Sequence, residues 1–240
     1  MTYYQKYWDK FKDPMHVIEN DAFYQSYIDE IRFYLGEKNT IVDTGCGRGE
    51  IIVRLADYYD KIYAIDFTYN MLDQAKALFE GKRSNHVEFI KANMLDIDQV
   101  LKEKVDVIYN NQVIQYLTEE EIESFVKKSK ALLNDEGRIV LMHIPNLECK
   151  NLFQIEFYRT TQFVSIYNIV KRKIALNLNK FKSKLFKKDY HYDDGIGYWF
   201  DPTLFYEIAD RLGLDCQVYG PRILGYRYRF HVVLELPKQN

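Results

Sequence analysis

The chain has 240 residues, of which 47% are hydrophobic and 28% are charged, so it can form one compact domain or one domain with a sizeable insertion. Its formal net charge of -2 argues against nucleic acid as a partner, because a phosphate-binding surface normally needs a clear basic excess. Cys46, Cys149 and Cys216 lack the spacing of a disulfide framework or a metal site. The first residues lack the apolar core of a signal peptide, and no later apolar run is long enough to span a membrane. We therefore expect a cytoplasmic protein without a bound metal.

Five short apolar runs predict the strands of a sheet. Each has strand length and β-branched content, and they cover Thr40 to Asp43, Ile62 to Asp66, Val87 to Lys91, Val105 to Asn110 and Arg138 to Ile144. The segments between them show helical periodicity, as in the apolar face formed by Met71, Leu72, Ala75 and Leu78. Strands that alternate with helices indicate a doubly wound α/β fold, in which helices cover both faces of a mostly parallel sheet.

Two later helices have clear boundaries. Thr118 is followed three residues later by Glu121, which predicts a capping box. Asp201 and Pro202 supply an N-cap and a first helical residue, and Gly213 can end that helix in the left-handed conformation.

The last part of the sheet differs from the rest. The apolar runs "LDCQVYG" and "YRYRFHVVLEL" follow each other without a helix, which predicts an antiparallel hairpin at the end of a seven-stranded sheet. Residues 147–197 lack strand alternation and are interpreted as a helical insertion or lid on the substrate side. Residues 1–146 and 198–240 then form the main domain.

The stretch "VDTGCGRGE" places Asp43, Gly45, Gly47 and Gly49 at alternate positions between the first strand and the first helix. Glycine permits positive φ there and removes side chains that would block a ligand. A glycine turn without a ligand and a dinucleotide loop are the alternatives. The even spacing and the charge of Glu50 fit a pyrophosphate poorly, so a positively charged or zwitterionic ligand fits better.

Polar groups follow three further strands at the same edge of the sheet, where open α/β sheets bind ligands. The Asp66 carboxylate can accept both hydroxyls of a ribose, and the Asn93 amide can pair with adenine. The backbone near Asn110 and Gln112 can face the rest of such a ligand, with Gln115 opening the next turn. Each of these groups alone is also typical of an ordinary polar loop.

These motifs together resemble the class I S-adenosylmethionine-dependent methyltransferases over roughly residues 38–145 and 200–236. The resemblance implies S-adenosylmethionine as cofactor and a methyltransferase activity. Two positions depart from the family pattern, since Asn93 stands where an acidic residue is usual and Gln115-Tyr116 replaces a frequent His-His pair. The cofactor-binding residues it implies are Asp43, Gly45, Cys46, Gly47, Gly49, Asp66, Phe67, Asn93, Met94, Asn110, Gln112 and Gln115.

A base could remove a proton from the methyl acceptor. His143 in the fifth strand is the first candidate, because an unperturbed imidazole titrates near neutrality, and His191 or a tyrosine is the alternative. His143 can equally be a packed core residue. Tyr192 and Trp199, near the exit of the insertion, are candidate substrate contacts, although that stretch can also be a solvated loop.

The insertion carries a basic amphipathic segment from Lys171 to Lys188 without acidic residues. It can lie on an anionic membrane, meet an acidic substrate or form a solvated face. The chain's ending is also similar to methyltransferases associated with bacterial surface-polysaccharide genes, which implies a small, phosphorylated or nucleotide-linked acceptor. A phosphoethanolamine-like or lipid-linked acceptor and a non-catalytic cofactor-binding module are the alternatives. The sequence makes no prediction about the oligomeric state.

Overall fold

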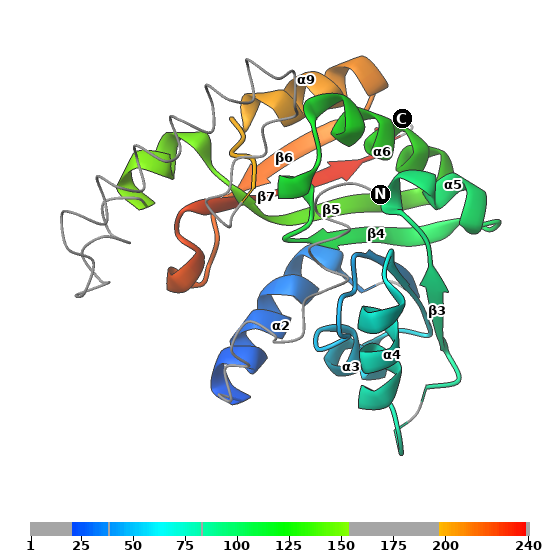
Figure 1. The fold of residues 1–240 in the computed structure, drawn as a ribbon. Coiled ribbons are helices and arrows are strands. Elements are labelled where there is room, and N and C mark those ends of the chain that lie inside the picture. The colour runs from blue at the N-terminus through cyan, green and yellow to red at the C-terminus, as the bar shows by residue number, and fades with distance from the viewer. Residues whose placement is uncertain (1–20, 38, 83, 154–196, 239–240) are drawn as a thin grey trace, which may run out of the picture.

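The computed structural model describes residues 21–37, 39–82, 84–153 and 197–238 (Figure 1). Most of the predicted insertion, with the basic segment from Lys171 to Lys188, lies outside these residues, as do His191 and Tyr192.

A seven-stranded sheet forms the centre of the molecule, with the strand order β3-β2-β1-β4-β5-β7-β6. The pairs among the first five strands are parallel, and β7 is antiparallel to both of its neighbours. The predicted terminal hairpin is therefore confirmed. The strands are β1 (Thr40–Thr44), β2 (Lys61–Asp66), β3 (Val87–Lys91), β4 (Val105–Asn111), β5 (Leu133–Pro145), β6 (Asp215–Tyr219) and β7 (Arg229–Glu235).

Helices cover both faces of the sheet, as expected for a doubly wound fold (Figure 1). One face carries α2 (Asp21–Leu35), α3 (Ile52–Leu55), the 3-10 turn η1 (Ala56–Tyr58) and α4 (Tyr69–Leu78). The other face carries α5 (Ile97–Val100), α6 (Glu119–Leu132) and α9 (Thr203–Leu212). Short 3-10 turns follow several strands, namely η2 (Met94–Asp96), η3 (Ile114–Tyr116), η4 (Leu147–Cys149) and η5 (Leu224–Tyr226).

Each face of the sheet has its own hydrophobic core. Alternate residues of the central strand β4 illustrate the division, since Ile108 packs against α5, α6 and α9 while Val107 and Tyr109 pack beneath α2 and α3. All three are fully buried, which is the expectation for a strand covered on both faces.

Local sequence signals located two of the predicted helix ends, and the third is shifted by one residue. Thr118 and Glu121 form the predicted capping box at the start of α6. Gly213 ends α9 with φ of 61°, as predicted. The N-cap of α9 is Pro202 instead of Asp201, although the Asp201 carboxylate accepts the backbone N–H of Thr203 at 2.9 Å. One prediction was wrong, because Leu78 at the end of α4 is 38% exposed and does not join the buried face of that helix.

A β-bulge interrupts the pairing of β5 with β7. Leu141 pairs with Val232 and Ile144 with Phe230, so two residues of β5, Met142 and His143, lie opposite the single residue His231. His143 has φ of 55°, a conformation that residues other than glycine rarely adopt. Bulges re-aim side chains, and this one turns His143 toward the face covered by α2.

Candidate active site

The glycine loop follows β1 and lies at the carboxyl edge of the sheet. Gly45, Gly47 and Gly49 all have positive φ, but their surroundings differ. A Cβ on Gly45 would lie 2.5 Å from a methyl group of Val113, and one on Gly49 would lie 2.9 Å from the Cβ of Ala75. Among the described residues, no heavy atom lies within 4 Å of a Cβ placed on Gly47. Packing therefore explains two of the glycines, whereas Gly47 borders open space that a ligand can use.

Asp66 ends β2 and ties the glycine loop to the next helix. One of its carboxylate oxygens accepts the backbone N–H of Gly47 at 3.1 Å, and the other accepts the N–H of Thr68 at 2.9 Å. Burial raises the pKa of this carboxyl, although the hydrogen bonds from Thr68 and Gly47 oppose that effect. A carboxylate held this way is in place to accept ribose hydroxyls beside the loop.

Asp43 is the second carboxylate of the site and is only 3% exposed. Its Oδ1 is buried, and the described part of the chain offers that oxygen no hydrogen-bond partner. Burial and, next, the charge of Asp66 raise the pKa of the Asp43 carboxyl to about 8. A cation bound here would satisfy an acceptor that the described residues leave unpaired. The site thus fits a ligand that carries positive charge, as S-adenosylmethionine does at its sulfonium and ammonium groups.

The Asn110 side chain, near the end of β4, forms hydrogen bonds that hold the start of the glycine loop in place. It is fully buried, its amide nitrogen donates to the carbonyl oxygen of Thr44 at 2.7 Å, and its amide oxygen accepts the N–H of Ile114. These bonds occupy the side chain, so only its backbone remains as the predicted cofactor contact.

The remaining predicted cofactor residues differ in exposure. Cys46 is buried, and burial raises the pKa of its thiol well above the ordinary value. Asn93 uses its amide oxygen to cap η2, where it accepts the N–H of Leu95 at 3.0 Å. Met94 is the first residue of that turn and is buried, and Phe67 is partly buried beside Asp66. The structure brings these residues to the same edge of the sheet as the loop.

Gln112 and Gln115 lie after β4 but contact the opposite side of the site. The Gln112 amide donates to the hydroxyl of Tyr27 at 3.2 Å and to that of Tyr226 at 3.4 Å. Gln115 accepts a hydrogen bond from the Arg229 guanidinium at 2.7 Å. Gln112 therefore connects the cofactor edge with α2 and η5, and Gln115 connects it with β7, although the sequence suggested a role toward the cofactor alone.

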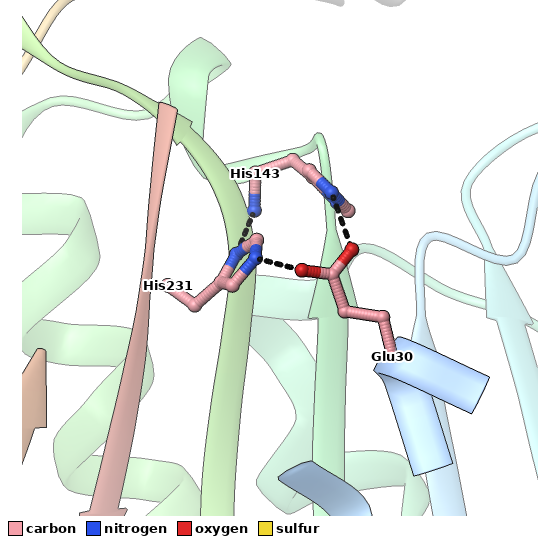
Figure 2. A group of neighbouring side chains, drawn as sticks. All are labelled: Glu30, His143 and His231. Atoms are coloured by element: carbon pink, nitrogen blue, oxygen red, sulfur yellow. Dashed lines mark hydrogen bonds and ion pairs between the residues drawn. The ribbon is translucent and has the colours of Figure 1, made fainter. Parts of the chain in front are cut away.

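His143 lies at the centre of a buried polar cluster that the sequence did not reveal. Its Nδ1 lies 2.9 Å from the Asn111 amide oxygen and 3.3 Å from the Tyr27 hydroxyl. On its other side, Nε2 lies 3.8 Å from the Glu30 carboxylate, which His231 also contacts at 3.2 Å (Figure 2). Tyr27 and Glu30 come from α2 and His231 comes from β7, so the cluster forms only when the whole sheet is assembled.

Burial dominates the electrostatics of this cluster. It lowers the pKa of His143 to about 4, although the Glu30 carboxylate opposes the shift. Burial also disfavours the charge on Glu30, but the nearby His143 and the hydrogen bonds from His231 and from the backbone of Arg222 outweigh it and hold the pKa of Glu30 below its usual range. His143 is thus neutral and Glu30 is ionised at physiological pH.

A narrow cavity of about 30 Å³ lies where β5 ends and β7 begins. Trp199, a predicted substrate contact, lines it together with Pro145, Phe153, Tyr226, Tyr228 and Arg229. Its volume suits a few atoms, so it can receive the reacting end of an acceptor and not a whole metabolite. A larger cavity of about 310 Å³, near Tyr63 and Glu88, is not lined by the predicted site residues.

Among the described helices, none combines the length and apolar character needed to cross a bilayer.

Comparisons with known proteins agree with this site. Residues 41–137 match a protein-family model described as a methyltransferase domain. Over 115 residues the chain is 31% identical to N-terminal Xaa-Pro-Lys N-methyltransferase 1 of Danio rerio, a match that covers 45% of this chain and 51% of the relative. The chain spans about half or less of the length of the curated relatives that it matches.

Solved structures extend the likeness to the whole fold. Magnesium protoporphyrin IX methyltransferase (ChlM) from Synechocystis PCC 6803, solved with S-adenosylmethionine bound, has a TM-score of 0.58 and 14% identity, with 98% of this chain and 92% of that chain covered. N-methyltransferase NodS from Bradyrhizobium japonicum WM9 has a TM-score of 0.59 and 11% identity, with coverages of 92% and 100%. Residues 41–137 thus match a methyltransferase domain, within a sheet that has the fold of known methyltransferases.

Proposed function

We propose that the protein transfers a methyl group from S-adenosylmethionine to an oxygen or nitrogen of a small, phosphorylated or nucleotide-linked metabolite, a precursor of a bacterial surface glycan. The arrangement of Asp43, Gly47 and Asp66 at one edge of the sheet carries the proposal. It joins a buried carboxylate oxygen that has no partner among the described residues, a glycine with none of them beside its Cβ position, and a second carboxylate, which suits a ligand with a positive charge and a ribose.

The cofactor supplies a methyl group that is already activated by its sulfonium. The protein must therefore align an acceptor and accept its proton, without an enzyme nucleophile. The narrow cavity beside Trp199 and Tyr226 supports a place for the acceptor next to the strand ends. His143 is the candidate base. Its ring packs against that of Tyr226, which lines the cavity, and the two ring centroids are 4.1 Å apart.

The lining of the cavity supports an anionic acceptor. The Arg229 guanidinium lines it and is partly buried, and burial lowers the pKa of Arg229 from its ordinary value. Burial disfavours the charged form of the guanidinium, and a phosphate beside it would stabilise that charge, since guanidinium and phosphate form strong charge-assisted hydrogen bonds.

The aromatic side chains that line the cavity favour a second candidate class of acceptor. Phe153 packs against Trp199 with ring centroids 5.4 Å apart, and against Tyr228 at 5.6 Å. Aromatic faces bind substituted ammonium groups, so a phosphoethanolamine-like or lipid-linked acceptor would be methylated on nitrogen. Contact of residues 171–188 with a membrane would agree with the lipid-linked case and stays a prediction.

An acceptor screen tests the proposed function. Wild-type protein is incubated with S-adenosylmethionine and, in separate reactions, with glucose 6-phosphate, UDP-glucose or phosphoethanolamine, and S-adenosylhomocysteine is measured. Turnover with a sugar probe supports the first candidate, and turnover with phosphoethanolamine supports the second. Tight cofactor binding without turnover on any acceptor of these classes would contradict both, and would identify a non-catalytic binding module.

A further inference from the structure

Four side chains form a continuous line from the narrow cavity into the protein interior. Tyr226 lines the cavity, and its ring centroid lies 5.6 Å from that of Tyr27. The Gln112 amide donates to both hydroxyls, at 3.2 Å to Tyr27 and at 3.4 Å to Tyr226, and so brings them together. The Tyr27 hydroxyl lies 3.3 Å from His143 Nδ1, and His143 Nε2 lies 3.8 Å from the Glu30 carboxylate. Tyr27, His143 and Glu30 are at most 3% exposed, so water has little access to this line.

His231 fixes the inner end of the line, at Glu30. The backbone N–H of His143 donates to His231 Nδ1 at 3.0 Å, so this nitrogen must carry a lone pair. The proton of neutral His231 is therefore on Nε2, from which it donates to Glu30 at 3.2 Å (Figure 2). The backbone N–H of Arg222 donates to the same carboxylate at 2.5 Å. These two donors hold Glu30 with its second oxygen directed at His143.

The same tautomer argues against a metal ion. Glu30, His143 and His231 have the composition of a two-histidine, one-carboxylate metal site, and their ligand atoms lie within 4.8 Å of one another. A metal would need the Nε2 lone pair of His231, yet that nitrogen holds the proton because Nδ1 accepts a backbone hydrogen bond. The cluster is thus arranged to hold a proton.

We propose that Tyr226, Tyr27 and His143 form a relay that carries a proton from a hydroxyl acceptor in the cavity to the buried imidazole, where Glu30 stabilises the imidazolium. This inference rests on the proposed methyltransferase function and specifies an oxygen acceptor. Within the relay, only Tyr226 touches the acceptor. Tyr27, His143 and Glu30 act behind it, and Glu30 and His231 are positioning residues.

Each proton that is released along this line is accepted by the next group. Methylation gives the acceptor oxygen a third bond, and that oxygen then releases its proton to the Tyr226 oxygen. The Tyr226 proton moves to the Tyr27 oxygen, and the Tyr27 proton moves to His143 Nδ1. The positive charge that entered with the methyl donor ends as an imidazolium paired with Glu30. The Asn111 amide oxygen faces Nδ1 at 2.9 Å and suits the protonated ring. For the neutral ring the amide is turned over, so that its nitrogen donates to Nδ1 and its oxygen accepts from the Tyr27 hydroxyl.

The electrostatic surroundings of His143 agree with an oxygen acceptor. Burial is the main cause that lowers the pKa of His143 to about 4; His231 and Arg229 act in the same direction, and Glu30 opposes them. A base this weak stays unprotonated at physiological pH and can still accept a proton from a protonated ether, which is a strong acid. It could not deprotonate an ammonium group, whose ordinary pKa is near 10.

Tyr27→Phe tests the relay, with Tyr59→Phe as the matched control. Tyr27→Phe keeps the ring that stacks on His143 and removes the hydroxyl from the line. Tyr59 is buried in the same core, and its hydroxyl bonds only weakly to the Gly36 carbonyl oxygen at 3.5 Å. For the acceptor selected by the screen, Tyr27→Phe should lower kcat by roughly 10²-fold at pH 7 with unchanged KM for S-adenosylmethionine. The deficit should shrink as pH rises, and Tyr59→Phe should retain wild-type kcat. Wild-type kcat in Tyr27→Phe would overturn the relay.

A measurement without turnover separates failure of the relay from failure of the proposed function. Nitrogen NMR of protein labelled with ¹⁵N-histidine reports which ring nitrogen carries the proton. We expect His143 Nδ1 to be unprotonated at pH 7, and its resonance to shift in Tyr27→Phe but not in Tyr59→Phe. A proton on Nδ1, or a stoichiometric metal ion in the purified protein, would overturn the relay even if the enzyme methylates a probe. An unprotonated Nδ1 that responds to Tyr27→Phe supports it even if no probe is methylated.

Discussion

Replacing Asp43 by asparagine should change how both folding and cofactor binding depend on pH. The pKa of this buried carboxyl is about 8 in the folded protein, against an ordinary 3.8. The folded state therefore holds a proton that the unfolded state has lost between these two values. Stability must then fall as pH rises through this window, because the unfolded state binds fewer protons.

The window between pH 6.5 and 8 isolates this effect. His143 contributes stability in the opposite direction, since its pKa of about 4 lies below the ordinary 6.5, but only about 0.4 kcal/mol of that contribution is added above pH 6.5. Asp43 should reduce the stability of the wild-type protein by about 1.6 kcal/mol between pH 6.5 and 8, because the slope of about 1.36 kcal/mol per pH unit falls to half as the carboxyl reaches its pKa. Asp43→Asn lacks the titrating group and should lose this slope, which urea unfolding at the two pH values would measure.

Cofactor affinity should show the reverse trend. A cation is bound best by ionised Asp43, so affinity for S-adenosylmethionine should rise roughly eightfold between pH 6.5 and 7.5 for a group that titrates at about pH 8. The amino group of the cofactor also titrates near this range, but it affects both proteins equally. Calorimetric titration of wild type and Asp43→Asn at both pH values gives the comparison. Parallel pH dependences in the two proteins would refute the role assigned to Asp43.

Three further substitutions address the cofactor loop, the ribose contact and the base. Gly47→Ala should lower affinity for S-adenosylmethionine at least tenfold, about 1.4 kcal/mol, because the added Cβ enters the open side of the loop. Gly81 also has a positive φ and no described neighbour at its Cβ position, so Gly81→Ala is the control and should bind the cofactor normally in calorimetry. Asp66→Ala should weaken binding of S-adenosylmethionine by about 1.5 to 3 kcal/mol, or roughly 10- to 150-fold in affinity. The control Asp106→Ala removes a carboxylate that accepts the backbone N–H of Thr40 and should bind the cofactor normally. Equal cofactor affinities of the two variants would contradict the ribose contact assigned to Asp66. His143→Ala should lower kcat by roughly 10²- to 10⁴-fold with nearly unchanged cofactor affinity, and full turnover in a destabilised protein would leave His143 a purely structural residue.

The cofactor half of the site could be predicted because it depends on short-range pattern. Each of the first four strands ends with a polar or glycine-rich segment, and a parallel sheet brings these ends to one edge whatever the rest of the chain does. Asp43, Gly47 and Asp66 were found in this way. The Asp43 oxygen that lacks a partner in the described part of the chain was not found, because it depends on how completely the neighbouring strands bury that side chain.

The buried cluster could not be predicted, because distant elements build it. Glu30 and Tyr27 belong to a helix that has no motif, and His231 reaches His143 only because β7 inserts next to β5. The bulge that turns His143 toward α2 also lacks a local signal, since no glycine marks its positive φ. The sequence therefore identified His143 as a candidate base but could not name the groups around it.

Transfer of an isotope-labelled methyl group tests the central claim most directly. Wild-type protein is incubated with S-adenosylmethionine that carries a ¹³C-methyl group and with the acceptor chosen by the screen, and the acceptor is then examined by NMR. We predict a new ¹³C-methyl resonance on an oxygen of the acceptor, formed in equal amount with S-adenosylhomocysteine. Release of S-adenosylhomocysteine without label in the acceptor, or tight cofactor binding without any release, would contradict a methyltransferase function.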